Sequence, residues 1–185
     1  MADSKAPDKI VYTPPWSAYV AIHDLESTAI SMTGGVGSAK TEAGCCWKWD
    51  RDCRNSQSVH SWIVMPTYGK IFDTAIPRYV KFLEKRCGLK KQRDFVIIKS
   101  PYPMLKYKPH IFKSEREIHF VSGSRPDTMV GVEVSDVWID EPGRMSSQVF
   151  TEVMERLRCP VAKVLQVLMT GSPQGLNWWA DEFDF

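Results

Sequence analysis

Short apolar runs alternate with longer amphipathic segments along most of the chain. The runs favour β-branched and aromatic residues, and they predict strands at 28–33, 60–65, 95–98, 118–121, 134–139 and 164–169. Apolar residues at helical spacing predict helices at 38–50, 68–88 and 145–158. The polar segments between them predict loops at 51–58, 99–110 and 122–131. Strands that alternate with helices indicate an α/β fold with a mainly parallel central sheet flanked by helices.

A glycine-rich turn follows the first predicted strand and precedes the first predicted helix. Its residues are Gly34, Gly35, Val36, Gly37, Ser38, Ala39, Lys40 and Thr41. They match the phosphate-binding pattern GxxxxGK[ST], a Walker A motif, except that Ala39 replaces the last glycine. Glycines let successive N–H groups surround a phosphate, and the following helix directs its N-terminus at the anion. We expect Lys40 to contact the β/γ-phosphates, Thr41 to reach Mg²⁺, and Ala39 to adopt the helical backbone of a helix start.

Two further motifs each follow an apolar strand. Asp140 and Glu141 end the run VWI and form a Walker B motif, in which Asp140 holds Mg²⁺ and Glu141 activates the attacking water. Thr170, Gly171 and Ser172 follow the last strand, where a hydroxyl can sense the γ-phosphate. Since the carboxyl ends of parallel strands share one edge of a sheet, these motifs predict a nucleotide site there.

Composition limits the class of protein more than it identifies a function. The chain has 185 residues, of which 43% are hydrophobic and 25% are charged, which is typical of one globular domain. No apolar run is long enough to cross a bilayer, so a membrane role is not expected. Residues 78–116 hold twelve Lys and Arg against three acidic residues, and this basic stretch indicates either a nucleic-acid contact or a solvated surface.

The five cysteines do not predict a disulfide framework or a zinc site. The number is odd, and the chain has no CxxC pair. Cys45, Cys46 and Cys53 lie near His60, but their spacing fits no common zinc pattern. We therefore expect free, mostly buried thiols in a reducing compartment.

The motifs together resemble the large terminase subunit of tailed bacteriophages. The resemblance rests, in chain order, on GGVGSAKT, WIVMPTYGKIFDTAIP, IHFVSGSRPDTMVG, VWIDEPGRM and LMTGSPQGLNWW. It implies a P-loop NTPase fold of the ASCE type and an ATPase that moves DNA into a prohead. Residues 1–27 would be an N-terminal arm that leads into the domain, and residues 28–185 would be the ATPase core. The nuclease domain of the family would be absent from this chain.

The resemblance also implies partners and residue roles. The partners of this chain would be double-stranded DNA, a small terminase subunit, a portal protein and further copies of the chain in a ring. The protein would be in the host cytoplasm and would dock transiently on the prohead. Lys40 and Glu141 would be catalytic, Thr41 and Asp140 would bind Mg²⁺, and Thr170, Gly171 and Ser172 would couple hydrolysis to movement.

Two positions depart from the pattern of the family. Many relatives carry arginine where this chain has Val36 and Val130. Arg125 and Arg144 are therefore the candidates for the arginine that stabilises the transition state. Two alternatives stay open: another ASCE translocase of the helicase-like kind, or a catalytically degenerate P-loop module for DNA binding or assembly.

Overall fold

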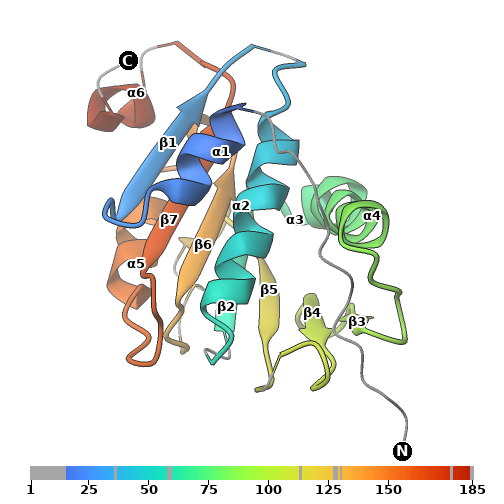
Figure 1. Cartoon of the computed structure of the whole chain (residues 1–185). Helices are drawn as coiled ribbons and strands as arrows, with labels where there is room; N and C mark the ends of the chain where they lie inside the picture. Colours follow the sequence, from blue (N-terminus) through green and yellow to red (C-terminus); the bar gives the residue numbers. More distant parts are fainter. Residues whose placement is uncertain are drawn as a thin grey trace, which may run out of the picture.

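The computed structural model describes residues 16–183, apart from positions 36, 58–59, 113, 127–128, 130 and 176. Seven strands form one sheet in the order β1-β7-β6-β2-β5-β4-β3 (Figure 1). The strands are β1 (Ala29–Thr33), β2 (His60–Met65), β3 (Phe95–Ile98), β4 (Met104–Tyr107), β5 (Glu117–Ser122), β6 (Asp136–Asp140) and β7 (Gln166–Gly171). β1, β7, β6, β2 and β5 pair in parallel, whereas β4 is antiparallel to both β5 and β3. The expected mainly parallel α/β fold is confirmed.

Helices cover both faces of this sheet. They are α1 (Trp16–His23), α2 (Lys40–Arg54), α3 (Tyr68–Lys70), the π-helical turn η1 (Ile71–Ala75), α4 (Ile76–Arg86), the 3₁₀ turn η3 (Pro142–Arg144), α5 (Gln148–Arg156) and α6 (Trp178–Phe183). One core cluster contains buried residues of α1, α2 and α4, such as Ala18, Trp47 and Leu83. The other contains Val149 and Val153 of α5, together with Trp179 of α6. The sheet is therefore the middle layer of three, with α2 in front and α5 behind in Figure 1.

Two sequence predictions were wrong at the level of elements. The predicted loop at 51–58 is helical as far as Arg54, because the polar residues Arg51 and Asp52 turn inward and find buried partners. The predicted connection at 99–110 contains β4, whose Leu105 and Tyr107 are buried while Lys106 is half-buried. In both places the polar residues predicted a solvent-exposed loop. Contacts with distant residues instead place part of each segment in a helix or a strand.

A group of buried charged residues joins α2 to the beginnings of β5 and β6. Lys48 and Asp52 of α2 pair with one another. Lys48 Nζ also lies 2.8 Å from Asp136 Oδ1, and Arg116 Nη2 lies 2.7 Å from both Asp52 Oδ1 and Asp136 Oδ2. All four side chains are fully buried, and the hydroxyl of Tyr79 donates to Asp52 Oδ2 at 2.8 Å. We call Lys48, Asp52, Arg116 and Asp136 the buried ion network.

Not all cations of the basic stretch at 78–116 are available to a nucleic acid. Arg116 is fully buried, so it is not available to a DNA surface. Lys106 pairs with Glu115 and Glu117. Among the described residues, no helix is long and apolar enough to cross a membrane.

Candidate functional site

The glycine-rich turn connects β1 to α2, as the motif predicts. α2 begins at Lys40, and Ala39 is its N-cap with φ 60° and ψ 19°, in the left-handed region. The expectation of a helical backbone at Ala39 was therefore wrong. This position is the last residue of the turn and not the first of the helix, so it takes the conformation for which glycine is usual.

The turn holds its lysine in a closed arrangement. Lys40 Nζ donates to the carbonyl oxygens of Gly34 at 2.6 Å and Gly35 at 2.8 Å, and lies 3.2 Å from Ser38 Oγ. A side chain at Gly34 would bring its Cβ within 2.7 Å of Ser38 Oγ, and Gly37 has φ +84°. The positive φ favours glycine at position 37, whereas a side chain at position 34 would force the Ser38 hydroxyl to move. Val36 lies outside the described residues.

Asp140 lies at the carboxyl end of β6, directly opposite Thr170 of β7 in the sheet register. Thr170 Oγ1 donates to Asp140 Oδ1 at 2.8 Å and itself accepts from Trp138 Nε1 at 2.8 Å. The Trp138 bond fixes the direction of the hydroxyl, because the indole can only donate. Burial raises the pKa of Asp140 to about 6, and the neighbouring Glu141 adds to this rise against the Thr170 bond.

Glu141 follows at a sharp change of chain direction. Its φ is 57°, which is unusual for a residue with a side chain and is typical of strained positions at functional sites. Its amide donates to the Thr170 carbonyl at 2.6 Å, and its Oε2 accepts from the Ser172 amide at 3.2 Å. Arg144 Nε lies 4.0 Å from the same oxygen. The carboxylate is 28% exposed, so solvent reaches a group whose position is fixed at two points.

A cleft of about 1030 Å³ opens over these groups. Its lining combines the three motifs with one face of α4, namely Gly37, Ser38, Ala39, Lys40, Thr41, Glu42, Cys45, Arg78, Lys81, Phe82, Lys85, Arg86, Glu141 and Ser172. Asp140 and Thr170 lie buried beneath the cleft, and Gly171 packs against Trp179. The structure therefore places the separate sequence motifs around one concave site.

The cations of α4 in this lining were missed by the sequence analysis. Arg78, Lys81 and Lys85 recur at spacings of three and four, which places them on one face of a helix. The spacing alone could have shown that these cations share one face of a helix. It could not show that this face lines the cleft. The charge of Arg78 acts on Asp140 and lowers its pKa, against the larger effect of burial.

The two arginines predicted for catalysis lie at the margin of the site. Arg144 belongs to η3 and its side chain is 58% exposed. Arg125 follows β5 and is exposed. Neither is among the described residues that line the cleft, whereas Arg78 is. The roles of Arg125 and Arg144 stay predictions.

Comparison with known proteins identifies the fold. No family model and no curated protein matches the sequence. Among solved structures, the large terminase ATPase domain of Thermus phage P74-26 aligns with TM-score 0.64 and 22% identity, over 94% of this chain and 70% of that one. The large terminase of a thermophilic bacteriophage aligns with TM-score 0.59 and 13% identity, over 87% of this chain and 39% of that one.

The same bacteriophage protein in complex with ATP-gamma-S aligns with TM-score 0.55 and 13% identity, over 86% of this chain and 38% of that one. At these identities the likeness shows the fold, which is that of phage large terminase ATPase domains. The chain spans about two fifths of the longer terminase.

Proposed function

We propose that the chain is a Mg²⁺-dependent ATPase whose activity drives double-stranded DNA into a viral prohead. The observation that carries this proposal is that Lys40 and Glu141 line one cleft and their charges act on the buried Asp140, in a chain that has the fold of terminase ATPase domains. The small terminase subunit, the portal protein and a ring of identical subunits in the host cytoplasm complete this proposal. They rest on the fold and on the motif resemblance.

The phosphates of ATP enter the glycine-rich turn, with α2 behind them. The ammonium of Lys40 exchanges its bonds to Gly34 and Gly35 for β- and γ-phosphate oxygens. The backbone amides of the turn and the start of α2 contribute further positive potential. The cations on α4 extend this potential along the cleft and favour a polyanionic ligand.

Thr41 and Asp140 fit a magnesium ion. A hydroxyl and a carboxylate are the hard oxygen ligands that Mg²⁺ prefers. The raised pKa of Asp140 marks a buried carboxylate whose charge the fold itself leaves poorly compensated, so a cation nearby would stabilise its ionised form. When bound, Mg²⁺ neutralises charge on the phosphate oxygens.

Glu141 is the general base of the proposed reaction. Its carboxylate takes a proton from a water molecule as the water oxygen attacks the γ-phosphorus and the bond to the ADP oxygen breaks. The Ser172 amide holds one carboxylate oxygen in place. Arg78 is positioned to neutralise charge that develops on the transferred phosphoryl group, with Arg125 and Arg144 as further candidates from this chain or a neighbour.

The end of β7 is the proposed coupling element. The carbonyl of Thr170 accepts from the backbone of Glu141, and the amide of Ser172 donates to its side chain. A change at the γ-phosphate that moves Glu141 must therefore move β7 or break these bonds. This gives a direct route from hydrolysis to the movement of a structural element.

Phosphate release by the assembled motor with DNA tests the proposal. Glu141→Gln is expected to bind a fluorescent ATP analogue normally while turnover falls by about 10²- to 10⁴-fold, because only the base is lost. Lys40→Ala is expected to lose binding as well, and Arg78→Ala to lose turnover by about 10-fold or more. Lys163→Ala, an exposed cation outside both the cleft and the basic stretch at 78–116, is the matched control and should change nothing. Full turnover in both Lys40→Ala and Glu141→Gln would refute the proposal.

A second candidate, a P-loop module without turnover, is favoured by one observation. Ala39 occupies a left-handed position that alanine tolerates poorly. This candidate predicts that wild-type protein binds the ATP analogue but releases no phosphate, even with DNA and all partners present. The same assay therefore separates the two functions.

A further inference from the structure

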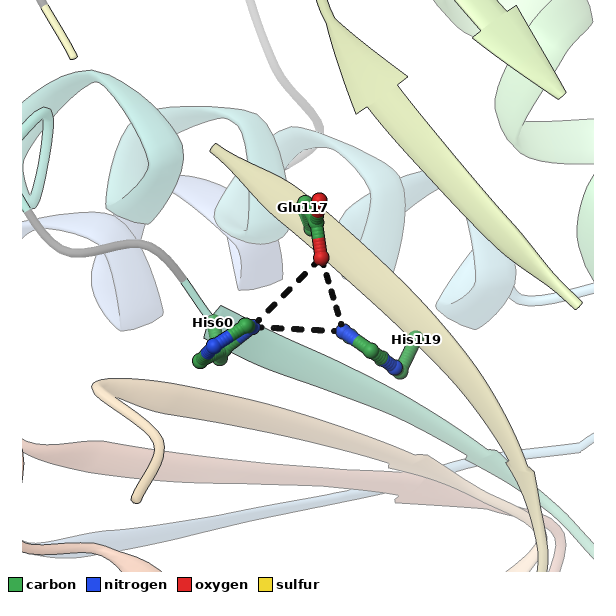
Figure 2. Close-up of side chains that lie close together, drawn as sticks. All are labelled: His60, Glu117 and His119. Atoms are coloured by element: carbon green, nitrogen blue, oxygen red, sulfur yellow. Dashed lines mark hydrogen bonds and ion pairs between the residues drawn. The ribbon is translucent and has the colours of Figure 1, made fainter. Parts of the chain in front are cut away.

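Two histidines and a glutamate meet at the amino-terminal ends of β2 and β5, whereas the cleft lies at the carboxyl ends of the parallel strands. His60 and Glu117 are the first residues of β2 and β5 and face each other in the parallel register, and His119 lies two residues further along β5. Figure 2 shows the three side chains directed at a common point. Since strand side chains alternate between faces, Glu117 and His119 share one face of the sheet.

The three nearest atoms form a nearly regular triangle. His119 Nε2 lies 3.3 Å from His60 Nδ1 and 3.3 Å from Glu117 Oε2, and His60 Nδ1 lies 3.6 Å from Glu117 Oε2. A point about 2.1 Å from all three atoms therefore exists, which is within the usual range of zinc–ligand distances.

These separations also indicate a coordination geometry. Ligands about 2.0–2.1 Å from a metal are about 3.3 Å apart in a tetrahedron but about 2.9 Å apart at adjacent octahedral corners. The observed triangle agrees with the tetrahedron. Two imidazole nitrogens and one carboxylate oxygen are a ligand set that zinc takes.

The surroundings of the triangle orient one ligand and leave the site accessible. Lys106 Nζ lies 3.1 Å from Glu117 Oε1, the other carboxylate oxygen, which leaves Oε2 directed at the histidines. A partner of this kind orients a metal ligand. The side chains of His60 and His119 are 31% and 21% exposed, so an ion and a water molecule can reach the site.

We propose that His60, Glu117 and His119 bind one Zn²⁺ ion, with water as the fourth ligand. The ion joins the beginnings of two adjacent strands whose first residues are 57 positions apart in the chain, and it does so away from the nucleotide cleft. Its role is then structural: it binds the folded arrangement and not the unfolded chain, so it stabilises the fold by mass action.

Titration of the chelator-treated protein with ZnCl₂ tests this site. We expect one Zn²⁺ per chain by calorimetry, and a rise in Tm of about 5–10 °C at a free zinc concentration one hundred times Kd. His60→Ala and His119→Ala should each weaken binding by about 100-fold or more, and Lys106→Met by about 10-fold. His60→Gln and His119→Gln keep the size of the ring position more closely, and their metal-free Tm reports whether the fold is retained.

Three variants serve as controls for other binding modes. His23→Ala removes an exposed histidine elsewhere, Cys53→Ser removes an exposed thiol, and Lys40→Ala disables the nucleotide site; all three should bind zinc as the wild type does. Co²⁺ in place of zinc should give the intense visible absorption of a tetrahedral ion without thiolate charge-transfer bands. Binding that survives both histidine variants, binding lost in Cys53→Ser, a weak octahedral cobalt spectrum, or no binding would each overturn the proposal.

Discussion

Two aspartates on one strand show opposite electrostatic behaviour. Asp136 begins β6 and Asp140 ends it, and both side chains are buried. Burial acts to raise the pKa of Asp136, but Lys48 and Arg116 outweigh it and hold that pKa well below its ordinary value. At the other end, burial raises the pKa of Asp140 to about 6, and the Thr170 hydroxyl only partly opposes the rise.

The difference separates a carboxylate whose charge the fold compensates from the carboxylate that we propose to bind Mg²⁺. The fold supplies Asp136 with two cations of its own, so its charge is compensated before any ligand arrives. Asp140 accepts one neutral hydrogen bond from Thr170, and this bond does not fully compensate its charge, so a nearby cation would stabilise the ionised form. Buried carboxylates with raised pKa values cluster at functional sites for this reason.

The largest effect is expected from breaking the buried ion network. Arg116→Met leaves Asp52 and Asp136 with Lys48 as their remaining network cation. We expect the free energy of unfolding to fall by about 3–5 kcal/mol, because a buried charge without its partner is costly. Urea denaturation measures this loss. Arg158→Met removes an exposed ion pair with Glu133 and should cost less than about 1 kcal/mol. Equal losses in the two variants would show that burial of the network contributes nothing.

An intermediate effect is expected at Asp140, and it depends on pH. Its native pKa lies above the ordinary value of 3.8, so the native state binds this proton more tightly than the unfolded state. Stability of the metal-free wild type therefore falls as the pH rises from about 4 to about 6. Asp140→Asn lacks this fall, and in chelator it should exceed the wild type by about 2–3 kcal/mol at pH 8 and match it near pH 4.

The matched variant at the other end of β6 should show the opposite dependence. The pKa of Asp136 is lowered, so its contribution is present at neutral pH and is lost only as the pH falls below the ordinary value of 3.8. Asp136→Asn should therefore be less stable than the wild type at pH 8. Unfolding midpoints that change in parallel for both variants would contradict the contrast between the two aspartates.

The smallest effect is expected in the turn that leads to the site. Ala39→Gly relieves a left-handed alanine and should raise the free energy of unfolding by about 0.5–1 kcal/mol. Ala43→Gly, four residues further within α2, should lower it by about 1 kcal/mol or more, because glycine weakens a helix interior. Thermal unfolding of both variants checks the sign. A decrease in both would mean that the φ of Ala39 stores no strain.

The site was predictable where its parts are local in sequence. Lys40 comes after the turn that follows β1, and Asp140 and Thr170 lie at the carboxyl ends of β6 and β7. The rule that the carboxyl ends of parallel strands lie on the same side of a sheet brings them together. The backbone of Ala39 was not predictable, because a shift of one residue in the helix start changes its conformation.

Features that depend on distant pairing were not available from the sequence. Arg78 enters the cleft through the packing of α4, and Arg116 is buried through partners 64 and 20 residues away. The histidine and glutamate triangle needs the register of β2 with β5, which no local pattern encodes. Mainly parallel strands and flanking helices were predictable, because hydrophobic periodicity indicates the elements and their alternation along the chain favours parallel pairing.

The closed glycine-rich turn has a consequence for how tightly a nucleotide is retained. In this arrangement the ammonium of Lys40 is already satisfied by the carbonyls of Gly34 and Gly35. A phosphate that arrives must displace these carbonyls, and a phosphate that leaves is replaced by them. In the ATPase that we propose, these carbonyls compete with the phosphate for the Lys40 ammonium and thereby lower the affinity for the nucleotide.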